Sequence, residues 1–176
     1  MARSTFELKS EAIEGMKGYF ANERFINHTL KVLDQAEKIA EGEGIRGDFT
    51  RGVIALASIY HDIGIPESLR KYSSMDAPYQ EKEGPAVARG LMAKIGVRPD
   101  VLERVCFIVG AHHTKPEVDG IDFQIIWEAD FIVNIEEKNL VFEKKDLPAA
   151  IGENVSTPAG KKLAHEAVAR MFPGGE

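Results

Sequence analysis

Apolar side chains recur every three or four positions along most of this chain, which is the spacing of helices that bury one face. No alternating run typical of a strand and no hairpin signal is found. The sequence therefore predicts an all-α protein, a single bundle of about six to eight helices with the functional site in its core. The predicted helices cover residues 4–20, 22–41, 48–61, 83–96, 99–113, 121–137 and 158–172.

Two longer stretches carry turn-forming residues without a clear apolar stripe, and we interpret them as connections. The first, Glu67–Lys82, is predicted to form a lid or loop with short helical pieces, and the second is Asn139–Ser156. Pro85 favours the first turn of a helix, because proline lacks the amide hydrogen that later turns need. The last four residues are predicted to be disordered. Without a repeat or a linker, residues 1–176 are predicted to form one domain.

The composition limits the classes of function. Of the 176 residues, 44% are hydrophobic and 28% are charged, as in ordinary soluble globular proteins. The longest apolar runs fall far short of the roughly 20 residues that a membrane span needs. The N-terminus shows no apolar signal core, so we expect a cytoplasmic protein. The net charge of −6 argues against broad nucleic-acid binding but permits a small phosphorylated substrate. The sequence does not indicate an oligomeric state.

Several histidines and aspartates stand at positions that face the predicted core. They are His28, His61, Asp62, His112, His113 and Asp130. His28, for example, shares a stripe with Phe25 and Val32. Two apolar stripes run in parallel before the His112–His113 pair, so either of these histidines can face inward. A lone histidine on an apolar face is more often a hydrogen-bonded core residue, but that explanation does not account for the whole set.

The whole set is typical of a metal site. A buried carboxylate is costly unless it is paired or bound to a cation, and two buried carboxylates would repel each other. A divalent cation resolves both problems, and neutral imidazoles complete its ligands. Two histidines and two aspartates suit Fe²⁺, Mn²⁺, Zn²⁺, Co²⁺ or Ni²⁺ with positions left open for water. We predict one such ion per chain, with two as the alternative.

The motifs around these residues resemble the HD superfamily of metal-dependent phosphohydrolases. Ile59–Gly64, which reads Ile-Tyr-His-Asp-Ile-Gly, resembles the signature segment of that family. Three further segments resemble the other ligand segments of the family: Phe25–Val32, Ile108–His113 and Trp127–Asp130. A fourth, Asn154–Ala164, resembles a C-terminal segment found in several members. The resemblance covers about residues 22–172 and implies a metal ion bound by His28, His61, Asp62 and Asp130.

The resemblance leaves a second metal ion open. Members with two metals use further histidines, and one of these corresponds to His112 or His113. Another stands three or four residues before a small residue, here Gly84, and this chain has no histidine there. Glu81 or Glu83 could take its place as a carboxylate ligand.

The leading hypothesis is hydrolysis of a nucleotide or another small phosphate ester by metal-activated water. Asp62 would combine metal binding with orienting the water. His112 or His113 would protonate the leaving oxygen or hold the phosphate, and Glu67 is a candidate general base. Cations that could bind the phosphate are Arg70, Lys71, Lys82 and Lys115.

Two other classes of function stay open. Some proteins that resemble this one in scaffold are HD-fold di-iron oxygenases, which need the fuller set of ligands. The chain could also be a metal- or nucleotide-binding module without turnover, because no general acid beyond the paired histidines is evident. Iron content with oxygen uptake, or nucleotide binding without product, distinguishes these classes from a phosphohydrolase.

Overall fold

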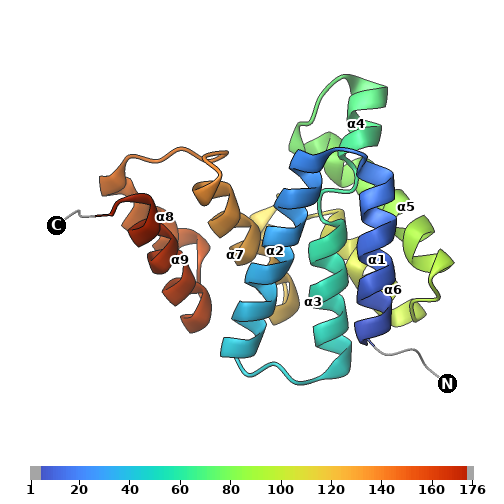
Figure 1. Cartoon of the computed structure of the whole chain (residues 1–176), viewed down its shortest axis with the longest axis horizontal. Helices are drawn as coiled ribbons and strands as arrows, with labels where there is room; N and C mark the ends of the chain where they lie inside the picture. The colour runs from blue at the N-terminus through green and yellow to red at the C-terminus, as the bar shows by residue number, and fades with distance from the viewer. Residues whose placement is uncertain (1–4, 174–176) are drawn as a thin grey trace.

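The computed structural model describes residues 5–173 and contains only helices, turns and loops in that range (Figure 1). The α-helices are α1 Thr5–Phe20, α2 Glu23–Gly42, α3 Asp48–Tyr60, α4 Ile65–Tyr72, α5 Ala77–Lys94, α6 Pro99–Val109, α7 Ile121–Glu136, α8 Leu147–Asn154 and α9 Pro158–Met171. Short 3₁₀-helices cover Lys115–Glu117 and Lys144–Asp146. The predicted all-α bundle is confirmed. Of the tail predicted to be disordered, residues 174–176 lie outside the described range. None of the helices described here is long and apolar enough to cross a membrane.

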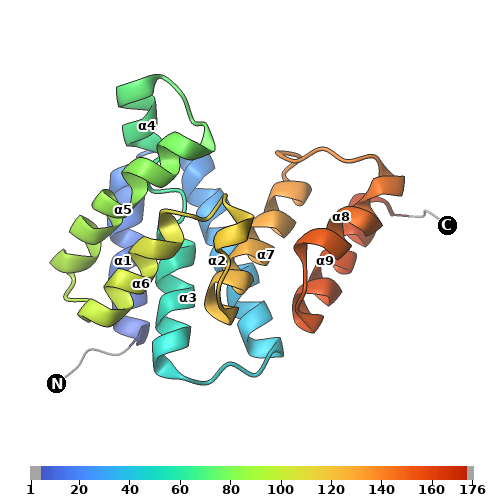
Figure 2. The same ribbon diagram turned by 180° about the vertical axis from the view of Figure 1, so that it is seen from behind.

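Helices α2, α3 and α7 form the centre of the bundle. α2 packs against both α3 and α7, and α3 also contacts α1 and α6. Helices α8 and α9 flank α2 and α7 on one side, while α5 and α6 lie on the other side and α4 stands at one end (Figures 1 and 2). Two clusters of buried apolar residues result, and α2, α3 and α7 contribute to both. The central helices are therefore held from two sides, which fixes the side chains that they present to one another.

Both segments predicted to be connections contain helices, and for the first of them the prediction includes short helical pieces. α4 fills much of Glu67–Lys82, and α5 begins at Ala77, so Pro85 lies inside α5 rather than in its first turn. Proline removes one hydrogen bond from the helix, but α5 is packed against both α4 and α6, which offsets that loss. α8 lies within Asn139–Ser156. Tertiary packing, rather than a local apolar stripe, stabilises these short helices.

The turn after the His61–Asp62 pair depends on a close approach of backbones. A β-carbon at Gly64 would lie 2.4 Å from the carbonyl oxygen of Gln80 and 2.8 Å from the amide nitrogen of Gly84. A β-carbon at Gly84 would in turn lie 2.7 Å from the side chain of Val109. Glycine at both positions lets the turn between α3 and α4 rest directly on α5, and α5 rest on α6.

We expect the Gly64→Ala variant to lose about 1–3 kcal/mol of unfolding free energy, because the atoms it would meet are backbone and cannot turn aside. Gly90→Ala is the matched control, since that exposed glycine of α5 has no atom within 4 Å of an added β-carbon. Alanine there is expected to add about 0.5–1 kcal/mol, because glycine costs backbone entropy in a helix. Urea unfolding of both variants measures the difference, and equal stabilities would contradict the close approach.

Candidate metal centre

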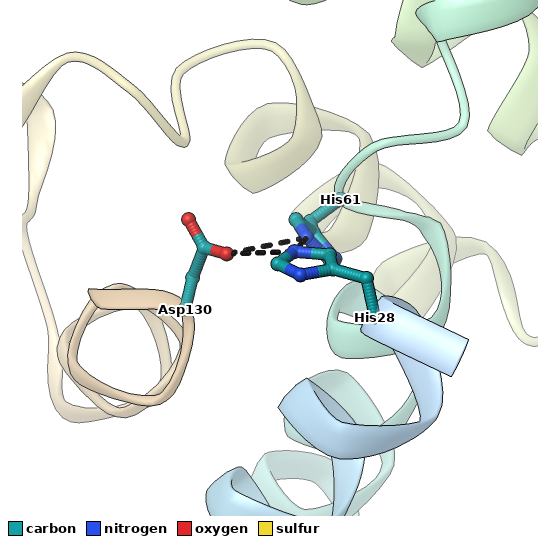
Figure 3. Close-up of side chains that lie close together, drawn as sticks. All are labelled: His28, His61 and Asp130. Atoms are coloured by element: carbon teal, nitrogen blue, oxygen red, sulfur yellow. Dashed lines mark hydrogen bonds and ion pairs between the residues drawn. The ribbon is translucent and has the colours of Figure 1, made fainter. Parts of the chain in front are cut away.

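Three side chains from different parts of the chain meet between the central helices. His28 comes from α2, His61 from the residue after α3, and Asp130 from α7 (Figure 3). Oδ1 of Asp130 lies 3.1 Å from Nε2 of His28 and 3.6 Å from Nε2 of His61. The two Nε2 atoms are 3.4 Å apart. His28 and His61 are buried, and the three ligand atoms are close enough together to hold one metal ion. We call these residues the first group.

Asp62 stands between the first group and a second one. Its Oδ2 lies 3.3 Å from Nε2 of His61 and 3.5 Å from Nε2 of His28. Its Oδ1 lies 3.4 Å from Nε2 of His112. Asp62, His112 and His113 form the second group, whose ligand atoms could also hold an ion. His112 is buried and His113 is exposed, and both residues line the same cavity.

The buried histidines are oriented by partners on the side of the ring away from the site. Nδ1 of His61 and Nδ1 of His112 each lie 2.8 Å from the backbone carbonyl oxygen three residues earlier. A carbonyl only accepts, so these Nδ1 atoms carry a hydrogen and donate it. Nδ1 of His28 lies 2.9 Å from Oε2 of Glu137. All three Nε2 atoms thus face the centre, as in metal-binding histidines whose other nitrogen is held by a carbonyl or a carboxylate.

The charges of this cluster are strongly linked. Burial opposes the charged form of His28, yet the hydrogen bond to Asp130 and the nearby carboxylates raise its pKa. Burial also opposes the charged form of His61, but the nearby carboxylates, Asp62 above all, hold the pKa of this ring well above its ordinary value. Burial opposes ionisation of Asp62 and Asp130, but the histidines hold the pKa of both carboxyls below the usual range. The carboxylates are therefore ionised at neutral pH, and a divalent cation would compete with protons for the imidazole nitrogens.

One buried nitrogen supports a cation at this place. Nε2 of His112 is buried and makes no hydrogen bond with any described residue. In the neutral ring, whose Nδ1 donates its hydrogen to a carbonyl, Nε2 is an acceptor, and it faces another acceptor, Oδ1 of Asp62. Two acceptors 3.4 Å apart repel each other unless a positive group lies near both. The residues present therefore fit a divalent metal ion.

A cavity of about 610 Å³ opens over these side chains. Polar residues that sequence reasoning did not single out also line it: Arg24, Gln80, Trp127, Asn134, Glu137, Asn139 and Asn154. Helical spacing could have found some of them. Arg24 precedes His28 by four residues, and Trp127 and Asn134 lie three residues before and four residues after Asp130, so they share a face with those ligands. Gln80 lies where the resemblance leads one to expect a further histidine.

The candidate residues on and near α4 do not reach this cavity. Glu67 accepts a hydrogen bond from Arg70 at 2.7 Å, and both lie on α4. Lys71 forms an ion pair with Glu83 of α5. Each charge is thus satisfied by an opposite charge outside the cavity lining. These four residues contact one another on α4 and α5, and none of them lines the cavity.

The remaining candidates also have other contacts. Glu81 accepts from the backbone amide of His113 at 2.9 Å, so it holds the turn that carries this histidine. The ammonium group of Lys82 lies 5.3 Å from the ring centre of Tyr72. Lys115 donates to a backbone carbonyl oxygen of α8. None of these three residues lines the cavity.

Comparison with known proteins identifies the family. The family model of the HD domain matches residues 25–157. The chain therefore belongs to the HD domain family, a superfamily of metal-dependent hydrolases, as the motifs predicted. The crystal structure of a predicted HD superfamily hydrolase from an uncultured Thermotogales bacterium is similar over 94% of this chain and 85% of that chain, with a TM-score of 0.63 and 20% identity. That similarity concerns the fold. No curated protein sequence gives a significant match.

Proposed function

We propose that this protein is a phosphohydrolase that acts on a small phosphate ester, such as a nucleotide, with a metal ion held by His28, His61, Asp62 and Asp130. The observation that carries the proposal is the convergence of imidazole nitrogens and ionised carboxylates on a cavity of about 610 Å³. Such a volume suits a nucleotide-sized ligand. A bound divalent cation would polarise a phosphoryl oxygen and make a water molecule more acidic.

The chain's own residues supply the remaining steps. Water attacks phosphorus, the bond from phosphorus to the ester oxygen breaks, and a proton passes to that oxygen, giving an alcohol and inorganic phosphate. Asp62 lines the cavity as a carboxylate and can accept a hydrogen bond from the attacking water. His113 also lines the cavity, and desolvation and the neighbouring His112 lower its pKa to about 4, so its neutral ring can donate a hydrogen bond to a phosphate oxygen while the leaving oxygen takes its proton from water. Asn134 donates to Oδ1 of Asp130 at 2.8 Å and so fixes that carboxylate.

The test combines elemental analysis with a phosphate-release assay on the purified protein and on His61→Ala. About one Mn, Fe, Co, Ni or Zn per chain, with phosphate release from nucleotides, is expected, and the variant should lose both. Two ions per chain would bring the second group into the metal site. Two irons with oxygen uptake would favour an oxygenase instead, and nucleotide binding without any product would favour a binding module.

The Glu137→Gln variant is expected to bind the metal ion about 10–100-fold more weakly, as losses of this kind of supporting carboxylate do. Glu137 contacts Nδ1 of His28 and is itself bound by Lys31 at 2.7 Å, so its charge sets the orientation and basicity of the ring. Glu136→Gln is the matched control, because Glu136 pairs instead with Arg170 of α9. Competition with a chelating dye measures both affinities. Equal affinities would show that Glu137 does not support the site.

A further inference from the structure

The mouth of the cavity holds an arginine whose charge no carboxylate neutralises. The seven other arginines within residues 5–173 each form an ion pair with an aspartate or glutamate. Arg24 forms no ion pair with any described carboxylate. Its Nη2 donates to Oδ1 of Asn139 at 3.2 Å. The side chain is exposed, and among the described lysines and arginines it alone lines the cavity.

Hydrogen bonds connect Arg24 to the metal centre. Asn139 uses its amide nitrogen to donate to Oδ1 of Asn134 at 3.0 Å and to Oε2 of Glu137 at 3.3 Å. Asn134 donates in turn to Asp130. The guanidinium group is therefore held by a continuous polar chain in a defined position relative to the metal ligands. An unpaired, positioned arginine beside a metal site is suited to bind a phosphate group through two hydrogen bonds.

The charges of the cavity limit how much negative charge a ligand can carry. Asp62, Asp130 and Glu137 line it, and Glu137 is paired with Lys31, whose ammonium nitrogen lies 2.7 Å from Oε1 of that carboxylate. Arg24 and one divalent cation together carry three positive charges against the two negative charges of Asp62 and Asp130, which leaves about one positive charge for a ligand. A single phosphate group is accommodated beside the cation, whereas a di- or triphosphate would place further negative charge near carboxylates with no other described lysine or arginine in the lining.

Two residues of the cavity lining carry a buried polar atom without a hydrogen-bond partner. Oε1 of Gln80 and Nε1 of Trp127 are buried, and neither has a hydrogen-bond partner among the described residues. The side chain of Gln80 is held in place because its amide nitrogen donates to the carbonyl oxygen of Met75. Both side chains line the cavity together with Phe25 and Phe131. Buried polar atoms without partners are rare, and a ligand with a matching donor and acceptor would satisfy these two.

We propose, on the basis of the proposed hydrolase function, that the cavity selects the monophosphate ester of a nucleoside-sized alcohol over di- and triphosphates. Arg24 binds the phosphate group. Gln80 and Trp127 hydrogen-bond the organic group, which packs against the aromatic side chains. This assigns specificity to residues outside both ligand groups.

The role of Arg24 is tested by calorimetric titration of inorganic phosphate into the manganese-loaded protein. Arg24→Gln is expected to bind phosphate at least about tenfold more weakly, the usual loss for a hydrogen bond to a charged group. Arg98→Gln is the control, because Arg98 pairs with Asp100 and does not line the cavity. Its affinity for phosphate is expected to match that of the wild type. Equal affinities in all three proteins would overturn the role of Arg24.

The role of Gln80 is tested with two substrates. Gln80→Leu is expected to raise KM at least about fivefold for a nucleoside monophosphate, with little change in kcat. Its KM for phenyl phosphate, which has no donor or acceptor on its organic group, should stay unchanged. Equal effects on both substrates would show that Gln80 acts only on the shape of the site and would overturn its role in specificity.

Selectivity among nucleotides is tested by titrating a nucleoside mono-, di- and triphosphate into the same manganese-loaded protein. The monophosphate is expected to bind most tightly, and tighter binding of the triphosphate would overturn the selectivity. This binding experiment does not require turnover. If no ester is hydrolysed with any metal, the proposed function fails, while the titrations still decide which phosphate group the cavity accepts.

Discussion

The Asp62→Asn variant is expected to lose metal binding and phosphate-ester hydrolysis together. Oδ2 of Asp62 faces the Nε2 atoms of His28 and His61, and Oδ1 faces Nε2 of His112. Asparagine keeps the shape but removes the charge, and it replaces one oxygen with a nitrogen that cannot bind a cation. The variant also loses the carboxylate that would accept a hydrogen bond from the attacking water. We expect kcat/KM to fall by about 100–1,000-fold or more, the usual loss when a central electrostatic group is removed.

Metal content and phosphate release are measured on the same preparation of this variant, beside Asp34→Asn. Asp34 is an exposed residue of α2 that pairs with Lys38, so its replacement makes the same chemical change away from the site. The control is expected to keep both metal and activity. An Asp62→Asn protein that stays folded, binds a full complement of metal and hydrolyses esters at the wild-type rate would overturn the assignment of Asp62.

Helical periodicity predicts that His28, His61 and Asp130 turn toward the interior, but it does not distinguish His112, which is buried, from His113, which is exposed. A side chain at the third or fourth position from a core residue shares its face, and this rule placed His28 beside Val32 on the buried side of α2. The structure brings His28, His61 and Asp130 together as that rule requires. Neither the metal nor the reaction follows from the rule, because several divalent cations accept the same nitrogen and oxygen ligands.

The predicted phosphate-binding cations Arg70 and Lys71 lie outside the cavity lining. Both lie in a segment that is predicted to flank the site, but a position along the chain does not determine the direction of a side chain. α4 is one of the short helices that were part of the prediction for this segment, and its two cations pair with Glu67 and Glu83. The cation that does line the cavity, Arg24, is 37 residues before His61 and is brought there by the packing of α2 against α3.

The contact of Glu137 with His28 could not be predicted from the sequence either, because the two residues are 109 positions apart and meet only where the end of α7 lies beside α2. A charge at the end of a helix is usually solvated, so the sequence alone gave no reason to single it out. The same holds for the hydrogen bonds that pass from Arg24 through Asn139 to Asn134. Their partners lie on separate elements, and only the tertiary structure shows which of them meet.

A second large effect concerns stability, and it arises from Glu128 of α7. This side chain is fully buried and lies two residues before Asp130. Its Oε1 accepts from the backbone amides of Ser156 and Thr157 at 2.8 and 2.9 Å, and from the side chain of Gln124 at 2.7 Å. Its Oε2 accepts from the hydroxyl group of Thr157. The carboxylate therefore satisfies amide groups at the start of α9, where the helix dipole favours a negative charge.

We expect Glu128→Ala to lower the free energy of unfolding by about 3–5 kcal/mol, because several donors at the start of α9 lose their acceptor in a buried place. Gly160→Ala is also expected to lower the free energy of unfolding, because a β-carbon there would lie 2.0 Å from Oε2 of Glu128 and would disturb the same contact. Glu136→Ala is the control, because that residue forms an exposed ion pair with Arg170, and exposed pairs contribute at most about 1 kcal/mol. Denaturant unfolding of the three variants gives the comparison.

A loss in Glu128→Ala no larger than in Glu136→Ala would contradict this role. Metal content separates the contribution of Glu128 to stability from the contribution of Asp130 to the site. Below its unfolding transition, Glu128→Ala is expected to keep its metal ion, because its carboxylate belongs to neither ligand group. The two sequence motifs at Trp127–Asp130 and Asn154–Ala164 would then be one structural unit. One carboxylate of α7 attaches the C-terminal helix, and the next carboxylate along the same helix faces the metal centre.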